Sequence, residues 1–234
     1  MNLPWETGDA IYSATGYLRW PAYVGILIWA CIRFPLSKIQ KVALCVIFAI
    51  SHYWAIRVTF LVSSFSKGIV PGANMGVSFL FFLMMVAAGA LVCKIPVLLA
   101  TDALIPAYVL GRGLAVTGCI FAGCCHGYPI AFGLYSRYAE TITFPTVPID
   151  CIISCGIVIA MIVLARKKQW SGDGSTTAIG LLLFGVLRVV IDVLRDSPKL
   201  IFPFTFEGLC GFVYLLIGAI LLIWLHNKHK KEIN

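Results

Sequence analysis

The segment from residue 111 to residue 129, GRGLAVTGCIFAGCCHGYP, concentrates reactive side chains inside an apolar chain. An arginine precedes three cysteines and a histidine: Arg112, Cys119, Cys124, Cys125 and His126. Residues of these types could form a metal site, a redox pair of thiols, or a nucleophile beside its base. A fourth possibility is that the cysteines only pack as small residues at a helix end.

The spacing of these residues weighs against the first two chemistries. A zinc site needs about four ligands in tetrahedral arrangement, and these would crowd on one turn of a helix. The CxxC spacing of thiol oxidoreductases is missing. We therefore expect no metal and no other cofactor. His126, which precedes a helix-breaking Gly-Tyr-Pro sequence, either acts as a base near neutral pH or bonds its own turn, and His52 and Asp192 are the next candidates for the base.

The composition points to a membrane protein. Of 234 residues, 60% are hydrophobic and only 12% are charged, a balance that soluble domains do not reach. Apolar stretches of roughly 20 residues, enough to cross about 30 Å of hydrocarbon, occur seven times, at 17–34, 41–63, 72–93, 98–123, 147–165, 177–196 and 206–226. We expect an all-α fold, a polytopic integral membrane bundle of about seven transmembrane helices, with residues 1–234 as a single transmembrane domain.

The distribution of basic residues predicts the orientation of the bundle. Ten of them fall in alternate loops and the C-terminal tail: Arg33, Lys38, Lys41, Lys94, Arg166, Lys167, Lys168, Lys228, Lys230 and Lys231. The positive-inside rule places these loops in the cytoplasm, and hence the N-terminus outside and the C-terminus inside. Orientation thus accounts for most of the net charge of +8, and no nucleic-acid partner is expected. The start, MNLPWETGDAIY, lacks the pattern of a cleavable signal peptide, so the first span is expected to target the chain.

Four further arginines lie within the predicted helices. A charge at mid-bilayer costs roughly 3 kcal/mol on insertion scales, so each marks either a functional site or a structural tie to a carboxylate or carbonyl. Arg188, Asp192 and Arg195 repeat on one helix face, where Asp192 would neutralise part of the charge. Because the guanidinium fork suits phosphate oxygens, we expect Arg57, Arg112 and Arg188 to converge on the headgroup of an anionic lipid.

The segment DALIPAYVLGRGLAVTGCIFAGCCHGYP resembles the signature of the bacterial prolipoprotein diacylglyceryl transferases, in the form of a divergent paralogue with Gly-Cys-Cys-His-Gly. Further similar segments follow the family order: AIRVTF at 55–60, PGANMG at 71–76, FPTVPID at 144–150 and LRVVIDVLRD at 187–196. The resemblance covers most of the chain. It implies a multi-pass protein of the bacterial cytoplasmic membrane.

Members of this family move the diacylglyceryl group of phosphatidylglycerol onto the lipobox cysteine thiol of a lipoprotein precursor and release glycerol phosphate. The implied partners are an anionic phospholipid and a precursor peptide. Arginines would stabilise the charge that develops on the phosphate leaving group. The expected catalytic residues are Arg188, Arg112 and His126. The expected substrate-binding residues are Arg57, Cys119, Gly118, Gly123, Asp192 and Arg195.

Four polar positions of the family pattern are replaced. Pro71, Val116, Cys119 and Cys124 stand where the family has a histidine, an arginine, an asparagine and an acidic residue. Arg112 lies one helical turn before Val116 on the same face, and its long side chain is expected to cover the lost guanidinium. The alternative is a paralogue that binds or handles phospholipid without the transfer reaction. A transporter would need a polar path through both leaflets, and little charge lies in the cytoplasmic half.

Overall fold

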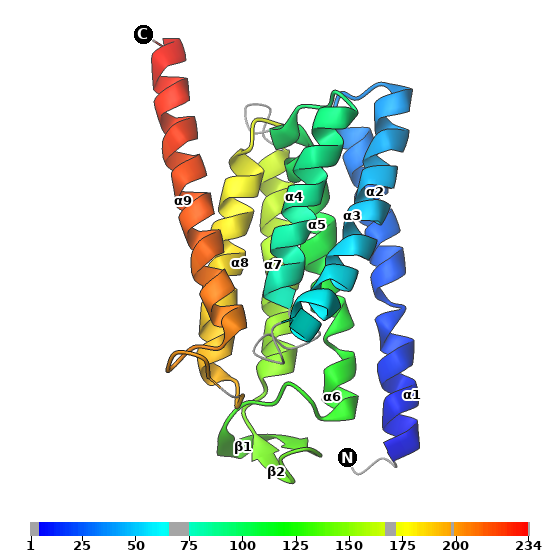
Figure 1. Cartoon of the computed structure of the whole chain (residues 1–234), viewed down its shortest axis with the longest axis vertical. Helices are drawn as coiled ribbons and strands as arrows, with labels where there is room; N and C mark the ends of the chain where they lie inside the picture. Colours follow the sequence, from blue (N-terminus) through cyan, green and yellow to red (C-terminus); the bar gives the residue numbers. More distant parts are fainter. Residues whose placement is uncertain (1–4, 66–74, 167–171, 198, 234) are drawn as a thin grey trace.

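The computed structural model describes residues 5–65, 75–166, 172–197 and 199–233. Within these ranges the chain forms nine helices and one small antiparallel sheet. The helices are α1 (Trp5–Gly16), α2 (Arg19–Arg33), α3 (Lys38–Phe65), α4 (Met75–Val92), α5 (Val97–Ala115), α6 (Gly118–Ala122), α7 (Thr146–Ala165), α8 (Ser175–Leu194) and α9 (Phe206–Ile233). The strands are β1 (Pro129–Ser136) and β2 (Thr141–Thr143). Figure 1 shows the helices side by side in a bundle, so the predicted all-α membrane fold is confirmed.

Six segments of the described chain are long and apolar enough to cross a membrane. They are Lys38–Val62, Met75–Val92, Val97–Ala122, Thr146–Ala165, Ser175–Leu194 and Phe206–Lys228, and they match the second to seventh predicted spans. The first predicted span, 17–34, falls on α2, whose 15 residues rise only about 22 Å. In Figure 1, α1 lies end to end with α2 and extends it.

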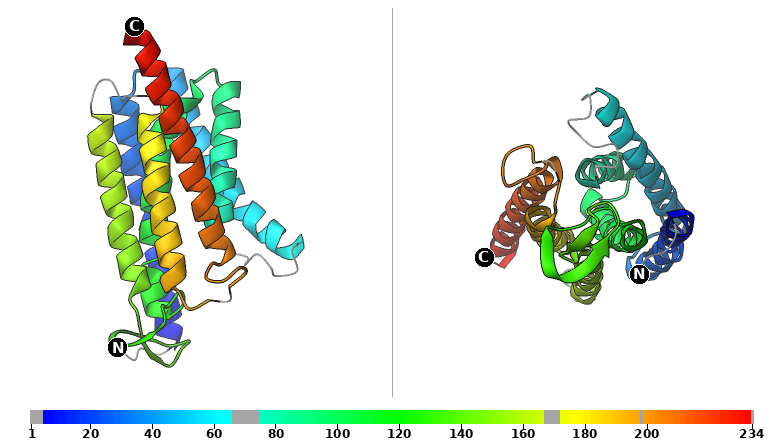
Figure 2. Two further views of the ribbon diagram at one scale, coloured as in Figure 1. Left: turned by 90° about the vertical axis from the view of Figure 1, so that its left-hand side faces the viewer. Right: turned by 90° about the horizontal axis from the view of Figure 1, so that it is seen from below.

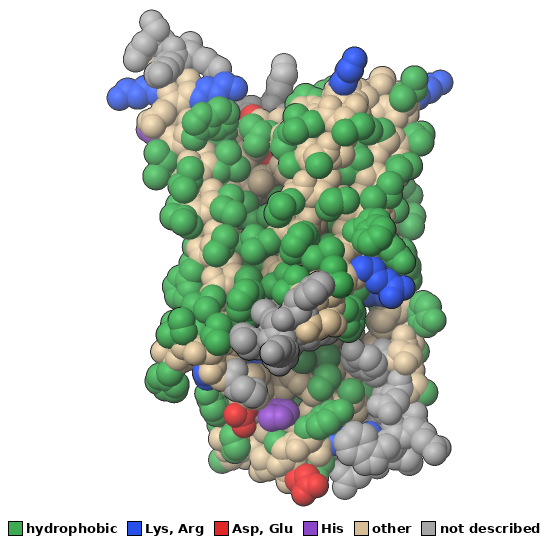
Figure 3. Space-filling model, viewed as in Figure 1, with side chains coloured by type: hydrophobic (Ala, Val, Ile, Leu, Met, Phe, Trp, Pro, Cys, Tyr) green, Lys and Arg blue, Asp and Glu red, His purple; other side chains and the backbone are tan. Residues whose placement is uncertain are grey.

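The two chain ends lie at opposite ends of the bundle (Figure 1). In Figure 3, apolar side chains cover the middle of one face, as lipid contact requires, and lysines and arginines project at its upper end. The same upper end holds the C-terminus in Figure 1. The assignment of that end to the cytoplasm stays a prediction.

Helix α5 positions the other elements because it lies at the centre of the bundle. It packs against α2, α4, α7 and α8, and its span is the most buried of the six. The chain breaks at Val116 and Thr117 and continues as the short α6, so the predicted span 98–123 is two helices. Helices α8 and α9 pack along each other beside this centre (Figure 2).

A buried carboxylate ties α5 to the start of α8. Asp102 accepts hydrogen bonds from the backbone N–H of Gly174 (3.0 Å) and Thr177 (2.7 Å), and from the Thr177 hydroxyl (2.6 Å). These contacts satisfy helix N-terminal N–H groups that have no partner within their own helix. Asp102, in the DALIPAY segment, is therefore a structural residue in this fold.

We expect Asp102→Ala to lower the free energy of unfolding by about 2–3 kcal/mol, because it strands buried backbone donors of α8. Denaturant unfolding of the purified protein in detergent measures the change. The matched control is Asp196→Ala, whose parent side chain is exposed. Equal stability of the two variants would contradict the role of Asp102 as a cap.

The β1–β2 hairpin was not predicted. It lies between α6 and α7 and crosses the end of the bundle opposite the C-terminus (Figure 2, right). Leu134 pairs with Thr143, and Ser136 with Thr141. A register irregularity separates the Leu134–Thr143 pair from the Pro129–Thr143 pair. The regular alternation of apolar residues is therefore too short to predict strands from the sequence.

Candidate active site

Three arginines and two carboxylates from four helical regions meet inside the bundle. Arg112 comes from α5, Arg188 from α8, and Arg195 from the residue directly after α8. Asp150 comes from the first turns of α7, and Glu207 from the first turn of α9. We call these five residues the arginine cluster.

Each carboxylate of the arginine cluster joins arginines from different elements. Asp150 accepts from Arg112 through Oδ2 and from Arg188 through Oδ1. Glu207 Oε1 accepts from Arg112 (3.2 Å) and Arg188 (3.1 Å), and its Oε2 accepts from Arg195 (3.0 Å). The pairs hold α5, α7, α8 and α9 in register at this level.

The cluster keeps one positive charge in excess, since three guanidinium groups face two carboxylates. Arg188, Asp150 and Arg112 are 1%, 1% and 4% exposed, so solvent does little to screen that charge. The Nε atoms of all three arginines are buried and have no hydrogen-bond partner among the described residues. An excess charge with three spare N–H donors suits an anion.

Asp192 forms no ion pair with the arginines among the described residues, although its negative charge helps to keep Arg195 cationic. Its Oδ2 accepts from the backbone N–H of Thr205 (2.7 Å), and its Oδ1 binds the Thr205 hydroxyl. The Thr205 hydroxyl in turn accepts from the backbone N–H of Glu207 (3.1 Å) and so caps α9. Asp192 thus positions Glu207, because it fixes the cap of the helix that carries it.

Arg195 lies just outside the predicted helix face, because α8 ends at Leu194 and the residue adopts extended backbone. It nevertheless joins the arginine cluster through Glu207. Burial opposes its charge, but the negative groups around it, Glu207 foremost, together outweigh burial and raise the pKa of Arg195 above its ordinary value. The group therefore stays cationic.

Arg57 does not converge with Arg112 and Arg188. Its side chain is exposed and its guanidinium lies 5.2 Å from the ring centroid of Tyr53, on the outer surface of α3. The convergence expected for Arg57 is wrong because α3 turns this side chain outward. It lines instead a groove of about 460 Å³ between α2 and α3, which Arg19 and Trp20 also line.

The candidate bases occupy different places. His126 is partly buried, and its Nδ1 lies 3.4 Å from the carbonyl oxygen of Gly127, within its own turn. Its backbone carbonyl accepts from Asp196 (3.1 Å), which tethers the turn beside Arg195. His52 lies away from this turn, with its ring stacked on Phe48 and its Nε2 3.3 Å from the Tyr23 hydroxyl.

The three cysteines of the opening segment lie together, but they do not lie on one turn of a helix as expected. Gly123 adopts a left-handed conformation (φ 77°) that ends α6 and folds the chain back. The Sγ atoms of Cys119, Cys124 and Cys125 consequently lie within 4.8 Å of one another. Hydrogen bonds from the other two thiols lower the pKa of the Cys125 thiol, and the positive charge of Arg195 adds to the effect against the opposing influence of burial.

Two of the glycines in this segment permit close approaches. A Cβ on Gly111 would lie 1.8 Å from Cε1 of Tyr23. Glycine at this position therefore lets α2 pack closely against α5. A Cβ on Gly123 would lie 2.7 Å from the backbone nitrogen of Arg137 in the β1–β2 turn. Gly118 is buried at the start of α6.

Gly123→Ala is expected to destabilise the protein by about 1–2 kcal/mol, because the left-handed backbone and the hairpin both exclude a Cβ. Gly25→Ala is the control, since an added Cβ there meets no atom within 4 Å. Thermal unfolding followed by circular dichroism compares the two. A Gly123→Ala variant as stable as the wild type would contradict the tight turn.

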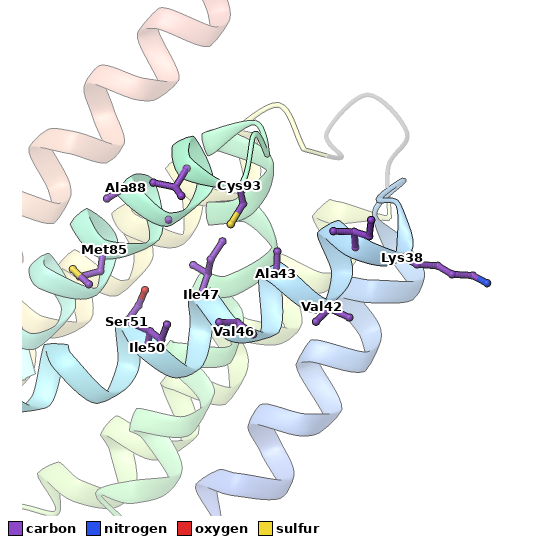
Figure 4. Close-up of a pocket in the computed structure, with 13 residues that line it drawn as sticks. Lys38, Val42, Ala43, Val46, Ile47, Ile50, Ser51, Met85, Ala88 and Cys93 are labelled. Atoms are coloured by element: carbon purple, nitrogen blue, oxygen red, sulfur yellow. The ribbon is translucent and has the colours of Figure 1, made fainter.

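The membrane-facing surface also carries a larger groove of about 710 Å³ between α3 and α4 (Figure 4). Ile47, Ile50 and Met85 line it, and Lys38 at its end extends away from it. Its lining is almost wholly apolar, which suits hydrocarbon chains, and Lys38 is the one charged residue among those that line it.

Sequence reasoning missed the two carboxylates of the arginine cluster. Asp150 closes the FPTVPID segment and Glu207 follows a loop, so each reads as a polar residue at the edge of an apolar span. Burying three arginines requires acidic partners, and that need was the available signal. The predicted residue Pro71 lies outside the described residues.

Comparisons with known proteins agree with the family that the motifs indicate. A family model described as prolipoprotein diacylglyceryl transferase matches residues 65–224. A Clostridium tetani protein named phosphatidylglycerol–prolipoprotein diacylglyceryl transferase is 26% identical over 108 residues, 44% of this chain and 43% of its own length. A Clostridium perfringens protein, numbered 2 under the same name, is 23% identical over 158 residues, 62% of this chain and 61% of its own length. The chain thus matches less than two thirds of the length of either relative.

Proposed function

Since the chain belongs to the prolipoprotein diacylglyceryl transferase family, we propose that it moves a diacylglyceryl group from an anionic glycerophospholipid, phosphatidylglycerol or a close analogue, to an acceptor thiol. The proposed acceptor is the lipobox cysteine of a prolipoprotein, as the names of the relatives suggest. The proposed location is the bacterial plasma membrane. The multi-pass apolar helices support this location.

The observation that carries the proposal is the excess positive charge of the arginine cluster. Arg112, Arg188 and Arg195 share two carboxylates and retain buried Nε–H donors without described partners. Transfer from phosphatidylglycerol forms a carbon–sulfur bond at the glyceryl carbon and breaks its bond to the phosphate oxygen, leaving a phosphate monoester. Guanidinium groups already fixed by Asp150 and Glu207 would stabilise that leaving group without reorganisation.

We propose that the remaining site residues, apart from Arg57, act beside the cluster at one end of the bundle. His126 is proposed to accept the thiol proton, because its turn is hydrogen-bonded beside Arg195. Cys119, Gly118 and Gly123 are proposed to form the wall next to it. Arg57 is proposed to attract the anionic headgroup at the α2–α3 groove, separate from the cluster.

A second candidate is a protein that binds phospholipid without transferring it. Asp150 and Glu207 occupy terminal nitrogens of all three guanidinium groups, which leaves fewer donors for a phosphate than unpaired arginines would. With fewer free donors, the cluster would stabilise a phosphate leaving group less well, which favours the candidate that holds the lipid without transferring it. The two candidates differ in whether a thioether forms.

The experiment supplies the protein, purified in detergent, with phosphatidylglycerol and a peptide that bears a lipobox cysteine. Mass spectrometry of the peptide measures the diacylglyceryl thioether, and a coupled assay measures released glycerol phosphate. The transferase predicts both products in equal amounts, and a peptide with serine at the lipobox cysteine predicts neither. Unmodified peptide beside retained phosphatidylglycerol would favour the lipid-handling candidate and contradict the transferase.

A further inference from the structure

The three-cysteine group lies beside the arginine cluster and is not needed for phosphate binding. Its members are Cys119 at the start of α6 and the adjacent pair Cys124 and Cys125. They pack with Val116 and Val147, so one side of the group is apolar and dry. All three cysteines are free thiols.

The geometry matches what a thiophilic cation requires. A tetrahedral zinc ion with zinc–sulfur distances of about 2.3 Å separates its sulfur ligands by about 3.8 Å. The three Sγ atoms lie within 4.8 Å of one another. Rotation of the cysteine side chains can bring the sulfurs to the separation that zinc requires. A small cavity of about 30 Å³, lined by Cys119, Cys124 and His126, adjoins the sulfurs, and this is room for roughly one water as a fourth ligand.

The backbone is built to bring the sulfurs together. Cys125 has a positive φ of 58°, a conformation that residues with a Cβ rarely adopt. The turn is held in place, because the Thr146 hydroxyl donates to the carbonyl of Cys125 (2.7 Å). Gly127, two residues further along the chain, pairs with Arg195. Strain retained by such contacts marks a functional constraint on the Cys125 side chain.

Charge also favours a metal thiolate at this position. Three thiolates around a divalent cation carry a net charge of −1, and the neighbouring arginine cluster carries +1. Binding releases the three thiol protons to solvent and forms three metal–sulfur bonds. We propose that Cys119, Cys124 and Cys125 bind one thiophilic divalent cation of the Zn²⁺ class, with the fourth position open to the adjoining cavity.

The test uses Co²⁺ as a spectroscopic probe of the full chain, purified in detergent under reducing, anaerobic conditions with any affinity tag removed. The expected result is one equivalent of Co²⁺ bound, with a thiolate-to-cobalt charge-transfer band, and its displacement by one equivalent of Zn²⁺. Cys124→Ser and Cys125→Ser are each expected to weaken binding by at least about tenfold. Cys93→Ser, at the opposite end of the bundle from the site, should bind like the wild type (Figure 1).

A second measurement does not depend on the folding of a variant. In the wild-type protein, Zn²⁺ should protect Cys124 and Cys125 from alkylation by N-ethylmaleimide, with Cys93 as the internal reference in the same peptide map. Three outcomes would overturn the site: no charge-transfer band, binding that survives Cys125→Ser, or a disulfide among the three cysteines whose reduction restores no metal binding. None of these outcomes depends on transfer activity, so the metal site can fail while the proposed function stands.

Discussion

Arg188→Lys is expected to lower the rate of diacylglyceryl transfer by about 100- to 1,000-fold, the usual effect of removing one preorganised donor to a developing anion. Lysine keeps the charge but loses the planar fork that reaches Asp150 and Glu207 together, and it has no Nε–H. The substitution therefore separates placed donors from charge alone. The lipobox-peptide assay measures the loss.

The matched control is Arg33→Lys. Arg33 donates to the backbone carbonyls of Ala165 (2.9 Å) and Arg166 (3.4 Å) at the predicted cytoplasmic end, away from the cluster. Its replacement should leave transfer unchanged. Full activity of Arg188→Lys, in protein whose unfolding matches the wild type, would remove Arg188 from the site.

Asp150→Asn should have the largest effect on stability, about 3–5 kcal/mol, because it leaves Arg112 and Arg188 buried with one carboxylate fewer. An amide also presents N–H donors to a guanidinium that can only donate. Denaturant unfolding in detergent measures the loss.

Asp196 is an exposed aspartate two residues after α8, and Asp196→Asn should change the free energy of unfolding by less than about 0.5 kcal/mol. In the double variant Asp150→Asn with Arg188→Met, the second change should cost less than Arg188→Met alone, because Arg188 has already lost its ion pair with Asp150. Strictly additive losses would show that the two side chains do not interact.

Hydropathy was sufficient to predict the six membrane-spanning helices because lipid imposes long apolar spans. Six predicted spans correspond to helices within a few residues at most ends. The convergence of Arg112 and Arg188 was also predictable, because charged side chains within transmembrane helices face the interior of the bundle. The outward position of the Arg57 side chain was not predictable. A helix that is apolar on all sides gives no sign of which face meets lipid, so its rotation about its own axis stays undetermined.

The contacts that define the site depend on where helices begin and end. The spacing of Asp192 and Arg188 places both on one helix face and suggested that they pair. In the structure, the Asp192 carboxylate instead accepts from the backbone N–H of Thr205 at the start of α9. The three cysteines looked crowded because a continuous helix was assumed. The left-handed Gly123 changes the path of the chain, and periodicity carries no information about such a turn.

The most direct test of the central claim is an experimental structure of the protein in a lipid nanodisc with bound phosphatidylglycerol. We expect the lipid phosphate within hydrogen-bonding distance of Arg188 and Arg195, bonded by the Nε–H groups that have no described protein partner. A phosphate held instead by Arg19 and Arg57 in the α2–α3 groove, with all five ion pairs of the arginine cluster intact, would contradict it.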